Sequence, residues 1–182
     1  ETENLKALRL INDLLEAYRI EDRTLNLQPR PFSIIDVTKQ IINSFEFRAK
    51  KANVKLLLVA NENTPHAFAD PKKIQLVIEH LIDNAISYSE GGETSISIER
   101  KKSSVVWTAS DQGVGIPTAE LKQVFGKFFR SHNRMRYHTG GLGLGLYLSR
   151  EIIRASGGNI NIRSIEGRGT TIWFTLPINP MT

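Results

Sequence analysis

The sequence predicts an α+β fold: a two-layer sandwich of a mixed, mostly antiparallel sheet with helices on one face, preceded by one long helix. Three observations favour this class. Apolar residues recur every three or four positions in several segments and alternate with polar residues in others. Helical and alternating segments follow one another at uneven spacing. The chain closes on two alternating segments joined by a glycine-containing turn, which is typical of a β-hairpin.

Length and composition indicate one globular domain with a short additional element. The chain has 182 residues, of which 40% are hydrophobic and 24% charged. It contains no cysteine, which excludes disulfides, thiolate metal sites and cysteine nucleophiles and favours a reducing compartment. Lys and Arg outnumber Asp and Glu by 24 to 19, which gives a net charge of +5. This excess fits a polyanionic ligand such as a nucleotide but also allows nucleic acid or acidic partners.

The sequence also predicts the cellular context of this portion. Its longest apolar run, Leu56–Ala60, is far too short to cross a bilayer, so we expect a cytoplasmic portion. The opening residues ETENLKALRL carry acids and lack the apolar segment of a signal peptide. Because a helical pattern begins at once, we expect the chain to continue upstream, and anchoring of the parent protein in the cell membrane stays open.

Residues 1–20 predict a helix with an apolar seam that needs a partner. The partner helix comes either from an upstream part of the protein or from a second copy of the chain, and docking of this helix on its own domain is the alternative. The seam residues follow coiled-coil-like spacings and are Leu8, Ile11, Leu15 and Tyr18, widened by Leu10 and Leu14.

The rest of the chain divides into a linker and alternating elements. Residues 21–32 contain charges and two prolines and predict a linker with a short extended segment at Leu25–Leu27. Ser33 and Asp70, the latter followed by Pro71, are good N-caps for two helices. The predicted helices begin at Ser33 or span 71–88, 119–125 and 144–155, and the predicted strands are 54–60, 94–98, 105–109, 160–162 and 171–176.

The helix over 71–88 has a polar stripe opposite its apolar face. The stripe consists of His80, Asn84, Ser87 and Tyr88, at positions that share one side of a helix. The amide oxygen of Asn84 can ligate a hard cation such as Mg²⁺, and Tyr88 offers a flat ring and a hydroxyl. A solvated helix face explains the same stripe without any ligand.

The motif DQGVGI, at residues 111–116, follows directly on a predicted strand. The Asp111 carboxylate can accept a hydrogen bond from the amino group of a heterocycle and so exclude an analogue that lacks this donor. Gly113 and Gly115 allow the backbone to approach closely. A tight turn is the alternative interpretation of the same residues.

The motif GGLGLGL, at residues 140–146, immediately precedes a predicted helix. Alternating glycines before a helix N-terminus are typical of a phosphate-binding turn, in which backbone N–H groups and the helix dipole attract the anion. A flexible hinge is the alternative. The basic stretch upstream, 127–141, is predicted to be a lid whose Lys127 and Arg130 reach phosphates.

In order and spacing these motifs resemble the ATP-binding domain of sensor histidine kinases. An asparagine-bearing helix is followed by D-x-G-x-G, F-x-x-F-F-R, G-x-G-L-G-L before a helix, and G-x-G-T before a strand. The wider group also contains gyrase, mismatch-repair and chaperone ATPases, but the F-x-x-F-F-R segment and the first helix favour the kinases. The resemblance implies part of a dimerisation and phosphoacceptor hairpin at 1–20, a linker at 21–32 and the catalytic ATP-binding domain at 33–182.

The resemblance implies ATP and Mg²⁺ as ligands and assigns roles to individual residues. Asn84 is implied as the Mg²⁺ ligand, Tyr88 as a ring beside the adenine, and Asp111 as the partner of the adenine amino group. Further nucleotide contacts are implied at Gly113, Gly115, Lys127, Arg130, Gly141, Gly143, Leu144, Gly145 and Thr170.

Two positions in the polar stripe depart from the family pattern. His80 stands where the family usually has a second asparagine, and imidazole is a poorer Mg²⁺ ligand than an amide oxygen. Ser87 stands where a basic residue is common, so one phosphate contact is in question. Both stay candidates for nucleotide contact. The alternative functions are a catalytically weak or degenerate nucleotide-binding module and an ATPase switch of the gyrase or chaperone type.

The phosphoacceptor of the family is a histidine followed by an acid, and this chain has none. The residues after His66, His80, His132 and His138 are Ala, Leu, Asn and Thr. The resemblance therefore implies a protein-histidine kinase whose acceptor lies outside this sequence, so that the chain alone does not autophosphorylate. The implied partners are the acceptor helix of the same or a paired chain, a homodimer formed through residues 1–20, and a response regulator. Nucleic acid is not expected.

Overall fold

Five strands form the sheet on which the molecule is built. The computed structural model describes residues 3–131 and 141–179. Across the sheet the order is β2 (Val54–Ala60), β4 (Gly92–Lys101), β5 (Ser104–Ser110), β7 (Gly169–Pro177) and β6 (Ile160–Ile165). β2 and β4 run parallel, and the remaining neighbours are antiparallel. The sheet is therefore mixed and mostly antiparallel, as the sequence predicts.

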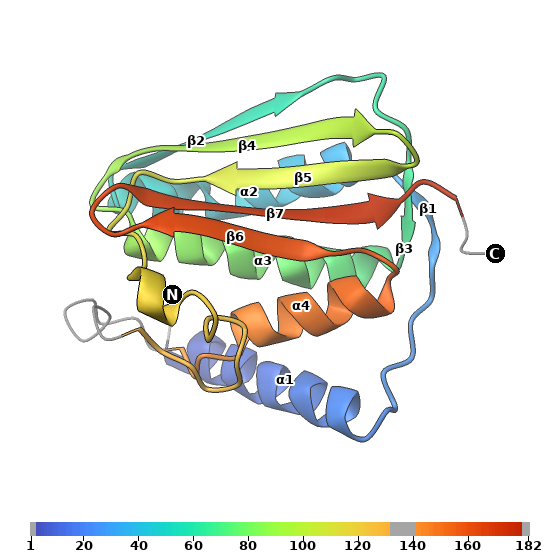
Figure 1. The fold of residues 1–182 in the computed structure, drawn as a ribbon, viewed down its shortest axis with the longest axis horizontal. Coiled ribbons are helices and arrows are strands. Elements are labelled where there is room, and N and C mark those ends of the chain that lie inside the picture. Colours follow the sequence, from blue (N-terminus) through green and yellow to red (C-terminus); the bar gives the residue numbers. More distant parts are fainter. Residues whose placement is uncertain (1–2, 132–140, 180–182) are drawn as a thin grey trace.

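Three helices cover one face of this sheet, which confirms the predicted α+β sandwich (Figure 1). They are α2 (Ile34–Lys51), α3 (Pro71–Tyr88) and α4 (Gly145–Ala155), and α3 contacts the other two. A fourth helix, α1 (Glu3–Glu21), lies beyond α4 and precedes the sandwich in the chain.

The core forms where the apolar residues of the strands meet the helices. Trp107 of β5 and Phe174 of β7 are fully buried and stack with ring centroids 5.3 Å apart. The indole Nε1 of Trp107 donates to Thr38 Oγ1 at 3.1 Å, and the Thr38 hydroxyl donates to the Ile34 carbonyl at 2.7 Å. The buried indole N–H of Trp107 and the buried hydroxyl of Thr38 each have a partner, so this pair of hydrogen bonds fixes α2 on the sheet.

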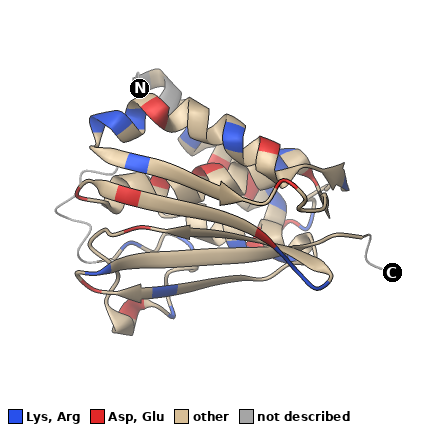
Figure 2. Ribbon diagram, turned by 90° about the horizontal axis from the view of Figure 1, so that it is seen from above, with Lys and Arg blue, Asp and Glu red and all other residues tan. Residues whose placement is uncertain are grey.

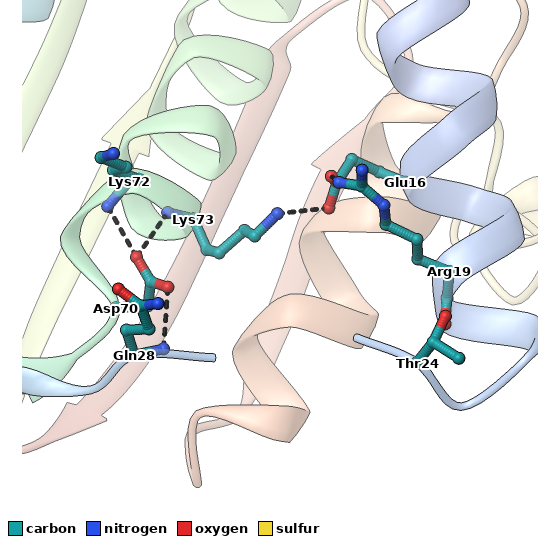
Figure 3. A network of polar contacts seen from close by, with 7 residues as sticks. All are labelled: Glu16, Arg19, Thr24, Gln28, Asp70, Lys72 and Lys73. Atoms are coloured by element: carbon teal, nitrogen blue, oxygen red, sulfur yellow. Dashed lines mark hydrogen bonds and ion pairs between the residues drawn. The ribbon is translucent and has the colours of Figure 1, made fainter. Parts of the chain in front are cut away.

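Asp70 determines how α3 begins and ties it to the linker (Figure 3). Its Oδ1 accepts hydrogen bonds from the backbone N–H groups of Lys72 at 2.9 Å and Lys73 at 3.3 Å, which caps the helix as predicted. Its Oδ2 accepts from the backbone N–H of Gln28 at 3.0 Å. One carboxylate therefore holds the linker against the start of α3.

Helix α1 has two different faces. On one face Ala17 is buried against Leu144 and Leu148, and the carboxylate of Glu16, a residue only 8% exposed, accepts from Lys73 Nζ at 2.6 Å (Figure 3). The predicted seam points to solvent instead, and the residues on it that are at least 45% exposed are Leu8, Ile11, Leu14, Leu15 and Tyr18. The helix thus docks on its own domain and still presents an apolar face.

Two short strands were not predicted and one local prediction is wrong. The strand in the linker region is β1 (Arg30–Phe32), which pairs with β3 (Ala67–Ala69) and buries the side chain of Phe32, whereas the segment expected to be extended, Leu25–Leu27, has no strand partner in the part of the chain that the structure describes. The segment 119–125 is not an α-helix but a 3₁₀ turn, η1 (Thr118–Glu120), followed by further turns. Between Pro117 and Gly126 the segment is too short to stabilise an α-helical nucleus.

The surface carries charges of both signs. Lys and Arg are interspersed with Asp and Glu along the ribbon (Figure 2). Within the ranges 3–131 and 141–179, no helix combines the length and apolar character that crossing a membrane requires.

Candidate functional site

One cavity brings together most of the side chains singled out from the sequence. Its walls come from α3, the loop after β5, the start of α4 and the adjoining ends of β6 and β7, with a contribution from α1. The sequence-predicted residues that line it are His80, Asn84, Tyr88, Asp111, Gly115, Gly141, Gly143, Leu144, Gly145 and Thr170.

The Asp111 carboxylate lies at one end of this cavity, where β5 and β7 meet. Its Oδ1 accepts hydrogen bonds from the N–H groups of Gly113 at 2.9 Å and Thr170 at 3.2 Å. Burial raises the pKa of the Asp111 carboxyl above its ordinary value of 3.8, while these two hydrogen bonds act in the opposite direction. Because both bonds fall on Oδ1, the second oxygen can accept a hydrogen bond from a ligand.

Gly113 shapes this end of the cavity although it does not line it. A Cβ atom at this position would lie 2.2 Å from the carbonyl oxygen of Tyr88. The next residue, Val114, donates its N–H to the same carbonyl at 3.1 Å. The last turn of α3 is thereby joined to the turn after β5, and Tyr88 and Asp111 both line the cavity.

Ser164 supports the same end and was missed by the sequence analysis. It lies on β6, is 7% exposed, and its Oγ is 2.8 Å from Thr170 Oγ1, from the Gly169 carbonyl oxygen and from the Ile116 nitrogen. The available sequence signal was its position on the inward side of an alternating strand, where a serine needs buried partners.

Apolar residues form the rest of this end and suit a flat ring. No motif contains them as a set, and the sequence analysis did not assign them to the site. They are Ala109, Val114, Ile116, Ile162 and Ile172, with Phe129 farther along the cavity wall.

The opposite end of the cavity contains the N-terminus of α4. Its N-cap residue, Leu144, makes no capping side-chain hydrogen bond, so the first N–H groups of the helix are not satisfied by a side-chain cap. A Cβ at Gly145 would lie 3.3 Å from Cγ of the His80 ring, so a side chain here would crowd the imidazole. A helix N-terminus that borders a cavity and lacks a side-chain cap is well suited to bind an anion.

His80 is held by a residue of α1. Its Nε2 lies 3.1 Å from Oδ1 of Asp13, which also lines the cavity and was not predicted. A carboxylate can only accept, so Nε2 carries the hydrogen. Among the described residues, the buried Nδ1 of His80 has no hydrogen-bond partner.

Some predicted residues do not line the cavity in the described part of the chain. Lys127 forms an ion pair with Glu21 of α1 and lies 5.2 Å from the ring centroid of Tyr147. Ser87 accepts a hydrogen bond from Arg48 Nη2 of α2 at 2.9 Å. Arg130 is likewise absent from the lining residues. The predicted lid, 127–141, falls largely outside the described residues, since 132–140 are not among them.

The donor set around Asn84 fits a magnesium ion carried by a nucleotide. The Asn84 amide lines the cavity and offers an oxygen ligand, whereas the carboxylate of the neighbouring Asp83, which also lines it, forms an ion pair with Arg48 of α2. In the described part of the chain there is no group of three or more His, Cys, Asp or Glu side chains that could hold a metal. Mg²⁺ commonly binds through one or two protein oxygens, substrate phosphates and water, so a small protein donor set is sufficient.

The fold is that of the class of histidine kinase-like ATPases. Residues 69–180 match the model of the histidine kinase-, DNA gyrase B- and HSP90-like ATPase family, and the chain belongs to this family. The match confirms the resemblance seen in the motifs. The structure of full-length ShkA in complex with AMPPNP has the same fold, with a TM-score of 0.83, 22% identity and coverage of 94% of this chain and 36% of ShkA.

Two curated relatives are sensory kinases. The sensor histidine kinase WalK of Bacillus subtilis is 33% identical over 180 residues, which cover 97% of this chain and 29% of WalK. The adaptive-response sensory kinase SasA of Crocosphaera subtropica is 35% identical over 174 residues, which cover 93% of this chain and 44% of SasA. These relatives favour a kinase over a gyrase or chaperone switch, and the chain spans less than half of either of them.

Proposed function

We propose that this chain is the ATP-binding catalytic portion of a two-component sensor histidine kinase, which transfers the γ-phosphoryl group of ATP to an acceptor histidine. The observation that carries the proposal is Asp111, a buried carboxylate with one oxygen held by backbone N–H groups and the other available in a cavity lined by apolar residues. The sensory kinases WalK and SasA, similar over nearly the whole chain, support it.

At the Asp111 end, the chain recognises the base. The free carboxylate oxygen accepts from the adenine amino group, the aliphatic side chains contact the ring, and Tyr88 packs beside it. Gly113, Gly115 and Thr170 keep the backbone close to the ring edge. A base with an oxygen in place of the amino group would bring two acceptors together and bind less well.

At the other end, the chain positions the phosphates. The N–H groups at the start of α4, next to Gly141, Gly143 and Leu144, provide positive potential for the triphosphate. Asn84 would hold Mg²⁺ through its amide oxygen, and the bound ion would neutralise charge on the phosphates. Lys127 and Arg130 are the further phosphate contacts. To make its contact, Lys127 leaves its ion pair with the Glu21 carboxylate and binds a phosphate of the nucleotide instead.

The acceptor histidine lies outside this sequence, because no histidine of the chain is followed by an acid. We infer that residues 1–20 belong to a dimerisation hairpin, that the exposed face of α1 pairs with another helix in a homodimer, and that 33–182 forms the catalytic domain after the linker 21–32. The phosphoryl group then passes to a response regulator. This portion works in the cytoplasm, where ATP is available.

Nucleotide titration tests the binding site. We expect Mg²⁺-dependent binding of a fluorescent ATP analogue, and we expect Asn84→Ala to weaken it at least tenfold in Mg²⁺ but little in EDTA. Asn43→Ala, on the exposed side of α2, is the matched control and should bind as the wild type does. Binding that ignores Mg²⁺, or an Asn84→Ala variant with unchanged affinity, would contradict the proposal.

Labelling with γ-labelled ATP tests the location of the acceptor. The isolated chain should remain unlabelled, whereas a longer protein that includes the upstream helix should carry label on histidine. Acid-labile label on the isolated chain would refute an external acceptor. Steady hydrolysis of ATP by the isolated chain, without label on the longer protein, would point instead to an ATPase switch.

A further inference from the structure

Two hydroxyl groups at the adenine end form a network in which every hydrogen-bond direction can be deduced. Ser164 Oγ lies 2.8 Å from the carbonyl oxygen of Gly169, 2.8 Å from the backbone nitrogen of Ile116 and 2.8 Å from Thr170 Oγ1. Ser164 is 7% exposed, whereas Thr170 lines the cavity.

The directions follow from what each group can do. A carbonyl oxygen only accepts, so the single hydroxyl hydrogen of Ser164 is donated to Gly169. A backbone N–H only donates, so Ile116 donates to Ser164. With its hydrogen already used, Ser164 can only accept from Thr170. The hydroxyl hydrogen of Thr170 therefore points to Ser164, away from a ligand.

The cavity side of Thr170 consequently presents an acceptor and no hydroxyl donor. Thr170 Oγ1 keeps a lone pair that can accept a hydrogen bond. At the same end the Thr170 N–H is directed at Oδ1 of Asp111 at 3.2 Å, which leaves Oδ2 of Asp111 as a second acceptor. On the cavity side both side chains can therefore only accept hydrogen bonds, and a 6-amino purine supplies the donor directly or through a water molecule. A 6-oxo purine supplies an acceptor there instead.

We propose that Ser164 is a positioning residue for base specificity: it orients the Thr170 hydroxyl so that the purine end of the site contains acceptors only. The inference rests on the proposed nucleotide-binding function and adds a residue that does not touch the base. Without Ser164, the Thr170 hydroxyl rotates freely and can donate to the oxygen of a 6-oxo purine. Ser164 thus acts by excluding the wrong base more than by binding the right one.

The test compares the dissociation constants of Mg·ATP and Mg·ITP on the whole 182-residue chain by calorimetry. Inosine triphosphate has an oxygen where ATP has its amino group and is otherwise closely similar. We expect Ser164→Ala to lower the ratio Kd(ITP)/Kd(ATP) about tenfold, mainly by tightening ITP binding. The free energy of one neutral hydrogen bond typically corresponds to a change of about that factor in a dissociation constant.

A matched control separates this effect from a loss of packing. Ser156, at the far end of α4, is another buried serine whose hydroxyl donates to a carbonyl, that of Ile152 at 2.8 Å, and it does not line the cavity. Ser156→Ala should leave the ratio unchanged. A purely structural role of Ser164 would weaken both nucleotides equally and also leave the ratio unchanged, which would overturn the proposal.

Variants of Thr170 keep the inference testable if Ser164→Ala does not fold. Thr170→Val removes the hydroxyl and should lower the ratio, whereas Thr170→Ser keeps a hydroxyl and should restore most of it. In the Thr170→Val background, Ser164→Ala should have no further effect on the ratio, and an undiminished effect there would refute the relay through Thr170. If the wild-type chain binds neither nucleotide, the proposed function fails; if it binds ATP with an unaltered ratio in every variant, only this inference fails.

Discussion

The two ends of the cavity are built from different kinds of contact. At the Asp111 end, neutral hydrogen bonds between strands and turns hold the walls, as in the Ser164, Thr170 and Gly169 network. At the α4 end, charged side chains of α1 hold the groups nearest the phosphate position: Asp13 contacts His80, and Glu21 pairs with Lys127. The first end is part of the sheet, whereas the second depends on a separate helix.

The difference indicates which half of the site can change. A buried neutral hydrogen bond, such as those of Ser164, costs free energy to break because its groups lose their partner. An ion pair can exchange one anion for another, and a phosphate is a strong competitor for a carboxylate. We therefore expect base recognition to be insensitive to the position of α1, and phosphate binding to depend on it.

The largest effect should come from Asp111→Asn. The amide keeps an acceptor for the two backbone N–H groups but places an NH₂ donor opposite the adenine amino group, so we expect at least a hundredfold loss of ATP affinity by calorimetry. The free energy of unfolding in urea should stay the same or rise at neutral pH, because burial raises the pKa of Asp111 and the fold bears an unfavourable charged carboxylate.

The pH dependence of stability checks the same residue. With a raised pKa the folded state holds the Asp111 proton more tightly than the unfolded state, so this group's contribution to stability is greatest below 3.8 and declines as pH rises through the folded-state pKa. Asp111→Asn should remove this decline. Asp36→Asn, an exposed acid on α2, is the control and should retain ATP binding. Full ATP affinity in Asp111→Asn would remove the distinction between the two ends.

Gly113→Ala should break the rigid end through its backbone. The added Cβ would lie 2.2 Å from the Tyr88 carbonyl oxygen, which cannot move without shifting the end of α3, so we expect a loss of about 2–4 kcal/mol in the free energy of unfolding. Gly167→Ala is the matched control: with a φ of +73° and no atom within 4 Å of the new Cβ, it should cost only about 1 kcal/mol. Equal losses in the two variants would show that close approach at Gly113 is unimportant.

Lys73→Met should release α1. It removes the Lys73 ammonium, 2.6 Å from the Glu16 carboxylate whose side chain is 11% exposed, and leaves that carboxylate the ion pair with Arg19 of its own helix. We expect docking of α1 to weaken by about 1–3 kcal/mol, seen as faster amide hydrogen exchange in α1 with unchanged protection in the sheet. Lys72→Met, at an exposed neighbour, should leave exchange in α1 unaltered. Uniformly faster exchange in α1 and sheet alike would argue against separable docking.

Glu21→Gln should give the smallest change, and here ATP affinity should rise instead of fall. Removing the carboxylate frees Lys127 for the nucleotide, and because the Glu21 side chain is 56% exposed we expect ATP affinity to rise only about two- to fivefold, most clearly at low salt. Asp22→Asn, an exposed acid one residue on, should have no such effect. Weaker ATP binding in Glu21→Gln would mean that this carboxylate supports the site instead of competing with phosphate.

Sequence reasoning worked where the determinants are local. Asn84 and Tyr88 share a helix face, Asp111 follows a strand, and the Asp70-Pro71 pair marks a helix start, so short-range spacing was sufficient. It failed for contacts made by distant segments. Asp13 is 67 residues from His80, and Ile116 is 48 residues from Ser164, so neither pair has a local signal.

The short strands were missed for a related reason. β1 and β3 have three residues each and depend on pairing with one another, which intrinsic preference does not reveal. In the turn after Pro117, only the tertiary position of Val124, which is 5% exposed, shows which side chain the segment contributes to the interior.

The bond from Gln28 to Asp70 determines how far α1 can travel from the catalytic domain. The chain is fastened again at Gln28, so the stretch that begins after Glu21 spans at most about 25 Å when fully extended. A detached α1 therefore stays at high effective concentration near the cavity, whatever the amount of protein in solution. Its Glu21 carboxylate can then compete with the nucleotide phosphates for Lys127. Inserting residues between Glu21 and Gln28 would lower the effective concentration of α1 at its docking site without altering any contact of the docked helix.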